Sequence, residues 1–513
     1  MTTAGGRGWW EHPAVVAALI LSVSLPLWFT ALPPLVDLLT HMARYRVQID
    51  LANDPLLQRN WGFHWAIIGN LGVDLLVWPL SKLIGLERAV WVIVAALPPL
   101  LAWGMVRTAR TIHGRLPGTA LAALPFALAY PFQFGFVNFW LGLGLAFHAF
   151  AFWPRFAGRR HWLVFVPVGL AVWVCHAFAW GVLGMLAGSW ELAEVLRRRP
   201  LRPIAGIGRI IARCAPLLFP ILPMLLWRSG GVGLNIAGWF LWEQKLQWLN
   251  EMLHDQSELL DVLSVVGIGL ALVAVLLVAL LRQRRLAIDL HLGIAALALA
   301  LLYLVMPYQI FGSAYADTRL APVMAIVFIL AIKPPSGLIE QLCAIAAVAL
   351  LASRLTVGVQ GYAAYDRDFT SHLRALDRIA PGSKVAALVG YACDRPWREA
   401  RTQHLASLAV VRRHAFVNTH WSTPGAELLV PKGALGTAYN ADPSQFVYDF
   451  KRCPTDLRPR LAKKVAAVPR DVFDYVWVFG FPPARLPAYP GLRPLYADGA
   501  SVLYAVEGKK GRP

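Results

Sequence analysis

An acid and an imidazole stand one helical turn apart in the segment PPLVDLLTHMARYRV, which spans residues 33–47. If this segment is helical, Asp37 and His41, at positions i and i+4, share one face, and the two prolines suit the first turn. A carboxylate placed in this way can take a proton from an alcohol, and an imidazole beside it can orient it, bind phosphate or help to hold a metal ion. The alternative is an amphipathic helix on a bilayer, whose Arg44 and Arg46 contact lipid phosphates.

The composition predicts an integral membrane protein. The 513 residues are 58% hydrophobic and only 15% charged, and the mean hydropathy is +0.54. A formal charge of +19 would suggest nucleic acid for a soluble protein, but many arginines lie between apolar runs, where they signal topology. We therefore expect no nucleic-acid partner. The first apolar run, residues 13–32, lacks a clear cleavage site and is expected to span the membrane.

Apolar runs long enough to cross a bilayer recur along the chain and predict about eleven transmembrane helices. Every second connection is basic, and the positive-inside rule places these connections in the cytoplasm: residues 107–115, 155–160, 197–202, 282–285 and the turn at Lys333. This assignment requires residues 65–85 to form a re-entrant or interfacial helix. The chain is thus predicted to begin in the cytoplasm and to end outside it.

This topology divides the chain into a transmembrane part, residues 1–353, and an extracytoplasmic part, residues 354–513. The predicted outer loops of the first part are residues 33–88, 228–261 and 307–319. The second part alternates helix-like and strand-like pieces, such as SKVAALVGY and FDYVWVFGF, and predicts a small α/β domain. Cys393 and Cys453 lie in it and could form a disulfide outside the cytoplasm. We find no internal repeat of the kind that many transporters contain.

Three polar residues are expected at the outer ends of the spans. The loop AYADTRLAP carries Asp317 and Arg319. An arginine retained there, against the charge trend, invites an anion, and its fork of donors fits a phosphate, although Asp317 could equally neutralise it. His176, in WVCHAFAW, falls where the chain turns on the same face, and is either a site residue or a histidine that is hydrogen-bonded to a neighbouring helix.

Further polar residues could line a substrate cavity on that face. Gln133 and Asn138 stand at the boundary between two spans in QFGFVNFWLGLGLAFH, whose glycines allow close packing. Asp54 belongs to the first outer loop, where Asn-Asp-Pro is also a common turn. Asp74 lies in an apolar segment with Lys82 as its expected partner. Walker, HExxH and hydrolase patterns are absent from the sequence, which disfavours ATP-driven and classical hydrolase functions.

The motifs PPLVDLLTH, GFVNFWLG, ADTRLAP and HLASLAVVRRHAFVNT resemble a bacterial branch of the glycosyltransferase C superfamily. Its members are multi-pass enzymes that move a sugar from a polyprenyl-phosphate carrier to an acceptor on the outer face. In architecture the resemblance covers almost the whole chain. It implies an α-helical multi-pass protein of the bacterial inner membrane, with a cytoplasmic N-terminus and a C-terminal periplasmic α/β domain.

The resemblance also implies roles for individual residues. The acid of the first outer loop in this superfamily is the catalytic base or binds a metal, and Asp37 matches that position. Many members carry two adjacent acids there, whereas Leu38 follows Asp37 here, so His41 is the natural second group and these two would hold a divalent metal ion if one is used. The implied reaction is an inverting displacement in which Asp37 deprotonates the acceptor hydroxyl, while Arg319, His176 and Arg44 bind the donor phosphate.

Two other functions stay open at the level of the sequence. A non-catalytic carrier, such as a lipid-linked-sugar flippase or a polysaccharide export component, would bind the same phosphate and sugar. A polymerase or ligase that uses diphosphate-linked oligosaccharides would differ only in its donor. The uneven loops and the outer domain favour an enzyme. Its expected partners are a polyprenyl-phosphate sugar, membrane lipid, and an acceptor hydroxyl on a glycan, lipid or protein.

Overall fold

The computed structural model describes residues 8–198, 200–228, 236–283, 287–310, 313–333, 337–390, 401–421, 427–447 and 461–508. Two compact units share the chain. Unit 1 consists of Met1–Phe29, Ile67–Leu75 and Val92–Gly361, and unit 2 of Thr30–Ala66, Leu76–Trp91 and Tyr362–Pro513. The segment expected as the first outer loop therefore belongs largely to the same unit as the C-terminal part.

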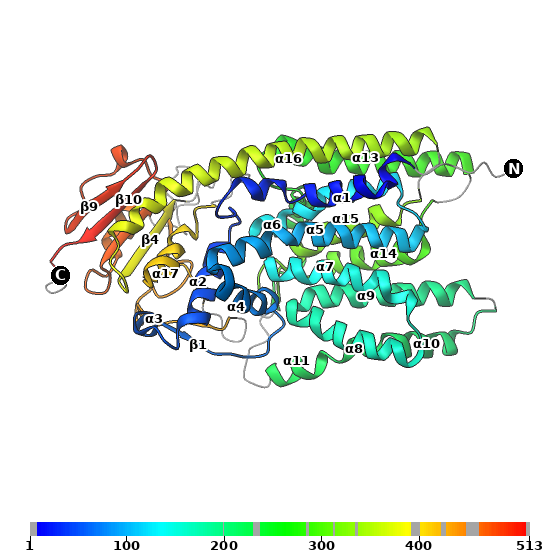
Figure 1. Cartoon of the computed structure of the whole chain (residues 1–513), viewed down its shortest axis with the longest axis horizontal. Helices are drawn as coiled ribbons and strands as arrows, with labels where there is room; N and C mark the ends of the chain where they lie inside the picture. Colours follow the sequence, from blue (N-terminus) through cyan, green and yellow to red (C-terminus); the bar gives the residue numbers. More distant parts are fainter. Residues whose placement is uncertain are drawn as a thin grey trace. The chain divides into compact units, whose positions relative to one another are not determined.

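Unit 1 is built almost wholly from helices, most of which run roughly parallel or antiparallel to one another (Figure 1). Helices α5 and α16 continue into unit 2, as does α4 (Gly72–Ile84). The helices are α1 (Pro13–Ser22), α5 (Leu86–His113), α6 (Tyr130–Phe134), α7 (Val137–Phe152), α8 (Gly158–Cys175), α9 (Ala177–Arg197), α10 (Pro203–Cys214), α11 (Ile221–Arg228), α12 (Trp242–Asn250), α13 (Glu258–Gln283), α14 (Leu290–Val305), α15 (Ala316–Ala331) and α16 (Leu338–Leu373). A short strand pair, β2 (Ile236–Ala237) and β3 (Gln309–Ile310), joins two of the connections.

Helix α13 shows why this unit suits a lipid environment. Its leucines at positions 259, 263, 270, 277 and 281 recur at helical spacing, and all of them are exposed. A continuous exposed apolar stripe would promote aggregation in water, whereas hydrocarbon solvates it without cost. The other side of the helix is anchored by a buried ion pair in which Arg354 donates to Asp261 at 2.8 Å.

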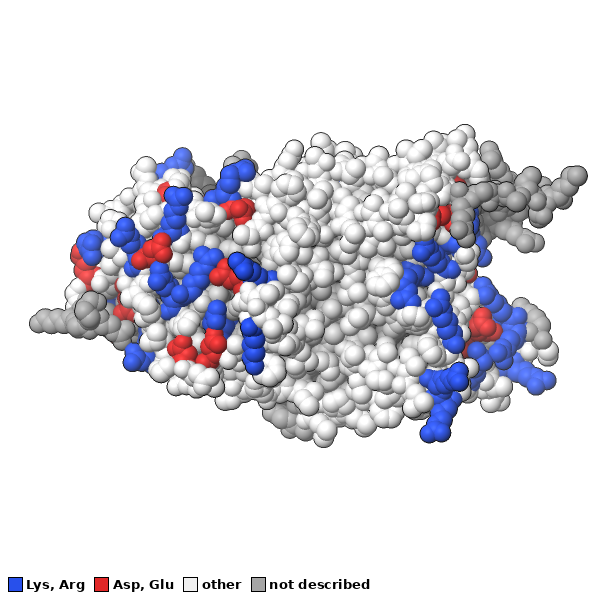
Figure 2. Space-filling view, viewed as in Figure 1, with Lys and Arg blue, Asp and Glu red and all other residues white. Residues whose placement is uncertain are grey.

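Three described helices are long and apolar enough to cross a membrane by length and composition alone: Leu86–His113, Glu258–Leu281 and Leu338–Arg378. Two shorter apolar helices are Pro13–Ser22 and Leu290–Val305. Figure 2 shows that the visible face of unit 1 is nearly free of charge along its helices, with Lys and Arg gathered at one end of them. This is the charge distribution of a membrane protein. The count of about eleven spans and their orientation stay predictions.

Unit 2 contains a mixed sheet in the strand order β5-β4-β8-β10-β9, with β7 also paired to β4. Strand β4 is parallel to β5, β7 and β8, while β10 is antiparallel to β8 and β9. Residues 385–389 of β4 are all buried, as expected for a central parallel strand covered on both faces. The strands are β4 (Lys384–Gly390), β5 (Phe416–Val417), β7 (Phe446–Val447), β8 (Tyr475–Phe479), β9 (Leu492–Ala497) and β10 (Ser501–Val506).

The N-terminal elements of unit 2 are folded into its C-terminal part. Strand β1 (Trp61–Phe63) pairs antiparallel with β6 (Leu429–Pro431), and the Trp61 indole donates to the Ala415 carbonyl at 3.2 Å. Helix α2 (Leu38–Asp50) packs on α17 (Leu408–Arg413) and on the 3-10 turn η7 (Leu405–Ser407). Two more helices, α3 (Pro55–Asn60) and α18 (Leu461–Ala467), complete the unit. Helix α2 is thus held by residues from the far end of the chain.

Candidate functional site

Helix α2 begins directly after Asp37, which occupies its N-terminal cap position. The Asp37 carbonyl accepts a hydrogen bond from the His41 backbone N–H at 3.1 Å, so the two residues stand one turn apart. The prolines of this segment precede the helix and do not form its first turn, which corrects the sequence-based expectation. Arg401 fixes this approach, because its guanidinium donates to the Pro34 carbonyl at 2.5 Å.

Unit 2 brings two further histidines to the Asp37 face of α2. The Nε2 atom of His404 lies 3.7 Å from Oδ1 of Asp37. One turn along α2, the Thr40 hydroxyl donates to the Thr419 carbonyl at 3.1 Å and lies 2.9 Å from Nδ1 of His420. Asp37, His404 and His420 are all buried. The site thus contains a buried carboxylate, the His404 imidazole beside it, and the His420 imidazole near Thr40, one helical turn further along α2.

The histidines of this cluster are uncharged at neutral pH. Burial lowers the pKa of His404 to about 3. Burial, with smaller effects from His404 and Arg44, also lowers the pKa of His420 to about 3. Burial and then Arg44 hold the pKa of His41 well below its ordinary value. A neutral imidazole can donate or accept a hydrogen bond without offsetting the charge of a neighbouring carboxylate.

His41 lies at the more exposed edge of the cluster. Its ring centroid is 6.2 Å from that of Trp421 and 6.5 Å from that of Tyr45. The Trp421 ring in turn lies 5.0 Å from the ring of His404. The Trp421 ring therefore lies near both the His41 and the His404 imidazoles.

Arg44, a predicted phosphate ligand, lies on the same face of α2 one turn beyond His41. Its guanidinium forms a buried ion pair with Glu427 at 3.2 Å and lies 5.3 Å from the ring centroid of Tyr45. A phosphate bound at this position would share Arg44 with Glu427.

Asp54, a predicted cavity residue, caps helix α3. Its carboxylate accepts hydrogen bonds from the backbone N–H groups of Leu56 at 2.8 Å and Leu57 at 3.0 Å, and it forms an ion pair with His414. These contacts describe a helix cap of the kind that Asp commonly supplies. The Asn-Asp-Pro turn considered in the sequence is therefore present, with Pro55 in the first turn of α3.

Arg319 lies in the first turn of α15, in unit 1. Its guanidinium donates to the carbonyls of Ala314 at 2.7 Å and Tyr315 at 3.0 Å and lies over the ring of Phe136 at 4.0 Å. Tyr315 has a positive φ of 59°, a conformation that costs a non-glycine residue energy and tends to occur at functional sites. A cation at a helix N-terminus opposes the helix dipole, so an anion bound there would relieve an unfavourable interaction.

His176 shares a neighbour with Arg319. It caps the N-terminus of α9, where its Nδ1 accepts from the Phe178 N–H at 3.1 Å. The Phe178 ring lies 5.7 Å from the His176 ring and 5.5 Å from the Arg319 guanidinium. The two predicted phosphate ligands are therefore brought to one aromatic cluster within unit 1, although they come from helices α9 and α15.

Asp317 pairs with a residue that the sequence did not indicate. The Nζ atom of Lys245 lies 3.2 Å from Oδ2 of Asp317, and both side chains are almost completely buried. Lys245 also donates to the carbonyls of Tyr303 at 2.9 Å and Met306 at 2.7 Å. This ion pair ties α12 to the start of α15, so Asp317 supports the turn that presents Arg319.

The remaining predicted cavity residues form hydrogen bonds within unit 1. The Asn138 side chain accepts from the Val73 N–H at 2.6 Å and donates to the Asp74 carboxylate at 3.1 Å. Asp74 is thus hydrogen-bonded by Asn138, where the sequence suggested Lys82. The Gln133 amide donates to the Leu128 carbonyl at 3.3 Å and is buried.

Metal and disulfide predictions have different outcomes. Within the described ranges, no group of three His, Cys, Asp or Glu residues is arranged to hold a metal ion. Asp37 and His41 stay the predicted ligands for a divalent ion. Cys393 and Cys453 lie outside the described residues.

Sequence reasoning missed His404, His420 and Lys245. His404 opens the motif HLASLAVVRRHAFVNT, and His420 follows directly after its last residue, so the motif that carried the resemblance contained part of the signal. Lys245 lies in the second predicted outer loop with no pattern around it. Its role becomes visible only when α12 is packed against α15.

No protein family and no curated protein matches the sequence. Among solved structures, the chain is similar to the crystal structure of ArnT from Cupriavidus metallidurans bound to undecaprenyl phosphate. The alignment covers 97% of this chain and 99% of the ArnT chain, with a TM-score of 0.45 and 14% sequence identity. At this score and identity it assigns no function and no residue role.

Proposed function

We propose that the protein is a membrane glycosyltransferase that moves a sugar from a polyprenyl-phosphate donor to an acceptor hydroxyl. The observation that carries the proposal is the buried Asp37 carboxylate, 3.7 Å from Nε2 of a buried, neutral His404. A buried carboxylate beside a neutral imidazole suits general-base chemistry, because the imidazole does not remove its charge.

The proposed reaction is an inverting displacement at the anomeric carbon of the sugar. Asp37 takes the proton of the acceptor hydroxyl, and the acceptor oxygen forms a bond to the anomeric carbon. The bond between that carbon and the phosphate oxygen breaks, and polyprenyl phosphate leaves with the electron pair. His41, which is half-buried at the edge of the cluster, would orient the acceptor through its neutral ring.

Arg319 and His176 are the proposed ligands of the donor phosphate. The Arg319 guanidinium presents a planar fork that matches phosphate oxygens, and His176 contacts the same aromatic cluster. As the phosphate leaves it gains negative charge, so the fixed Arg319 cation would stabilise the transition state more than the bound substrate. Asp37 and Arg319 belong to different units, and each role is proposed from the contacts within its own unit.

The acceptor is proposed to be a hydroxyl of a glycan, lipid or protein on the outer face of the bacterial inner membrane. In this arrangement the N-terminus is cytoplasmic and the C-terminal domain periplasmic. The apolar exterior of unit 1 supports a membrane-embedded donor, because a polyprenyl chain partitions into hydrocarbon.

One experiment separates the enzyme from a carrier of the same ligand. The purified full chain in lipid vesicles is given a polyprenyl-phosphate sugar and a cell-envelope extract that contains acceptors, and free polyprenyl phosphate is measured over time. A transferase releases polyprenyl phosphate in proportion to the acceptor supplied. A flippase moves the intact lipid between leaflets and releases none, which would overturn the proposal.

A further inference from the structure

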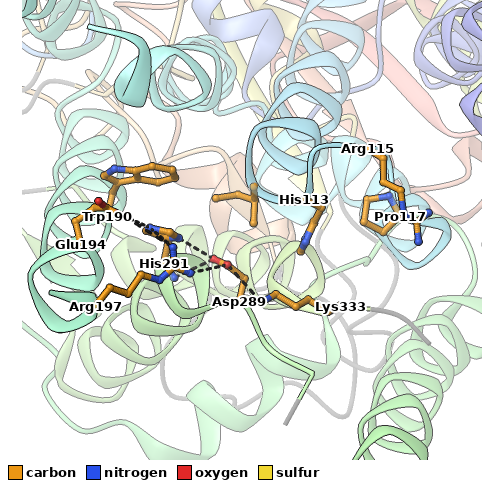
Figure 3. A pocket seen from close by; sticks show the side chains of 10 residues that line it. His113, Arg115, Pro117, Trp190, Glu194, Arg197, Asp289, His291 and Lys333 are labelled. Carbon is orange, nitrogen blue, oxygen red and sulfur yellow. Dashed lines mark hydrogen bonds and ion pairs between the residues drawn. The ribbon is translucent and has the colours of Figure 1, made fainter. Parts of the chain in front are cut away.

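A second polar site lies in unit 1, apart from the groups discussed so far. A pocket of about 480 Å³ is lined by the end of α5, the connection after it, the end of α9, the start of α14, and Lys333, which follows α15. Figure 3 shows Arg197 and Lys333 pointing toward Asp289 from opposite sides, with His291 between Asp289 and Glu194. All of these residues belong to unit 1, and the proposed transfer reaction uses none of them.

The pocket exposes three cations, whereas one of its two lining carboxylates, Asp289, is buried. The side chains of Arg115, Arg197 and Lys333 are 41%, 45% and 51% exposed. Asp289, by contrast, is 4% exposed, and Glu340, the partner of Arg115, is 6% exposed. A solute that enters the pocket therefore meets guanidinium and ammonium groups before it meets the acids, except at Glu194, which is 32% exposed.

Asp289 has a structural role, because it caps a helix and pairs with two cations. Its Oδ1 atom accepts from the backbone N–H groups of His291 at 2.9 Å and Leu292 at 3.3 Å, which caps helix α14. Its Oδ2 atom is 3.5 Å from Arg197 and 3.9 Å from Lys333. These are long ion pairs, and Arg197 forms another with Glu194 at 3.8 Å. Asp289 therefore draws the two cations together while several of their N–H donors are left to other acceptors.

His291 and Trp190 hold Arg197 in position. The two rings stack at 4.0 Å with an interplanar angle of 16°. His291 lies 3.2 Å from Oδ1 of Asp289 through Nδ1 and 3.1 Å from Oε1 of Glu194 through Nε2. Arg197 lies 3.2 Å from the same Nε2 atom. The cation is thus part of a built site and is not a freely moving surface side chain.

We propose that this pocket binds a phosphate group, with Arg197 and Lys333 as its principal ligands. The arginine supplies a planar fork and the lysine a compact point charge, a combination that recurs at phosphate sites. The phosphate comes either from the headgroup of an anionic phospholipid or from a soluble phosphate ester. Basic pockets between transmembrane helices favour the lipid source, and Ile112, Trp190 and Pro117 add apolar lining.

The test uses the full-length protein, purified in detergent and stripped of lipid. Native mass spectrometry measures the affinity for phosphatidylglycerol, with phosphatidylcholine as the uncharged comparison, and calorimetry measures the affinity for inorganic pyrophosphate. The double variant Arg197→Gln, Lys333→Gln should lose at least tenfold in affinity for whichever anion the wild type binds. The matched control is Arg159→Gln, Arg160→Gln, which removes the same charge from exposed residues at the start of α8 and should bind like the wild type.

The two binding measurements identify the source of the phosphate, and each can contradict the proposal. Loss of phosphatidylglycerol binding only in the pocket variant assigns a lipid headgroup, and loss of pyrophosphate binding only there assigns a soluble ester. If the double variant fails to fold, Lys333→Gln alone replaces it, and Lys333→Arg should retain binding. The proposal is overturned if the wild type binds neither anion, if the pocket variant binds as well as the wild type, or if the control loses as much.

Discussion

The carboxylate of Asp37, near the start of the chain, lies 3.7 Å from Nε2 of His404, in the C-terminal part of the same unit. This contact exists because α2 packs on α17 and on the turn that follows His404. Asp37, the acid that the sequence singled out, therefore has His404 as its imidazole neighbour, whereas the sequence suggested His41. His41, one turn along the helix, is left at the edge of the cluster.

His404 is expected to act on the reaction through Asp37, as a positioning residue. His404→Ala should lower kcat about tenfold or more, because a small displacement of a catalytic group is costly. Removing the imidazole that packs 3.7 Å from the Asp37 carboxylate admits water, which favours the charged carboxylate, so the acid limb of kcat/KM against pH should move to lower pH. His404→Gln, which refills much of this space, should recover part of both effects. An unchanged pH profile in His404→Ala would count against a link to Asp37.

The stability of unit 2 should fall in mild acid. His404 and His420 have pKa values of about 3 in the folded protein and near 6.5 when unfolded, so only the unfolded chain takes up their protons as the pH falls through this window. Their contribution to stability is full above pH 6.5 and is lost toward pH 3, at about 2 kcal/mol per histidine by pH 5. The midpoint of thermal unfolding should therefore drop between pH 7.5 and 5.0. His420→Gln should show a smaller drop, and an equal drop in both proteins would contradict the assignment.

Arg319 should determine the affinity for the lipid phosphate. Arg319→Lys keeps the charge but loses the planar fork, and should weaken binding of polyprenyl phosphate about tenfold. Arg319→Gln should weaken it further. Native mass spectrometry with the stripped protein measures both, and Arg159→Gln, which removes a charge at the start of α8, serves as the control. Equal affinity in all four proteins would remove Arg319 from the phosphate site.

The Lys245–Asp317 pair should be worth more to stability than any exposed ion pair of the described chain. Lys245→Met leaves Asp317 as a buried acid without its cation, and should cost about 3–5 kcal/mol of unfolding free energy. The double variant Lys245→Met, Asp317→Asn removes both charges and should recover much of the loss. Thermal unfolding in detergent gives the comparison. If the double variant is less stable than Lys245→Met by the full effect of Asp317→Asn alone, the two residues are not coupled.

Local patterns predicted much of the secondary structure. The pieces SKVAALVGY, FDYVWVFGF and SVLYAV contain strands β4, β8 and β10, because alternating or continuous β-branched and aromatic residues favour strands. The spacing of Asp37 and His41 corresponds to one turn at the start of α2. The apolar character of unit 1 followed from composition. All of these depend on neighbours in the sequence.

Long-range contacts could not be read from the sequence. The pairing of β1 with β6 ties Trp61 to Pro431, and neither strand carries a pattern that names its partner. The same holds for Lys245 with Asp317, since an isolated lysine in a loop has no periodicity to interpret. His404 was present in a motif that carried the resemblance, but its role depended on which face of α17 meets α2. These partners are determined by charge and packing in the folded structure, which the sequence alone does not display.

Asp37 is the proposed base of the sugar transfer. Asp37→Asn keeps the size of the side chain and removes its basicity, whereas Asp50→Asn makes the same change at the other end of α2, where Asp50 pairs with Arg46. The decisive measurement is the rate of polyprenyl phosphate release from a polyprenyl-phosphate sugar, with the thermal midpoint of each variant taken alongside. Asp37→Asn should lower the rate at least about 100-fold with a midpoint close to the wild type, while Asp50→Asn should stay active. Near-normal release by a folded Asp37→Asn protein would contradict it.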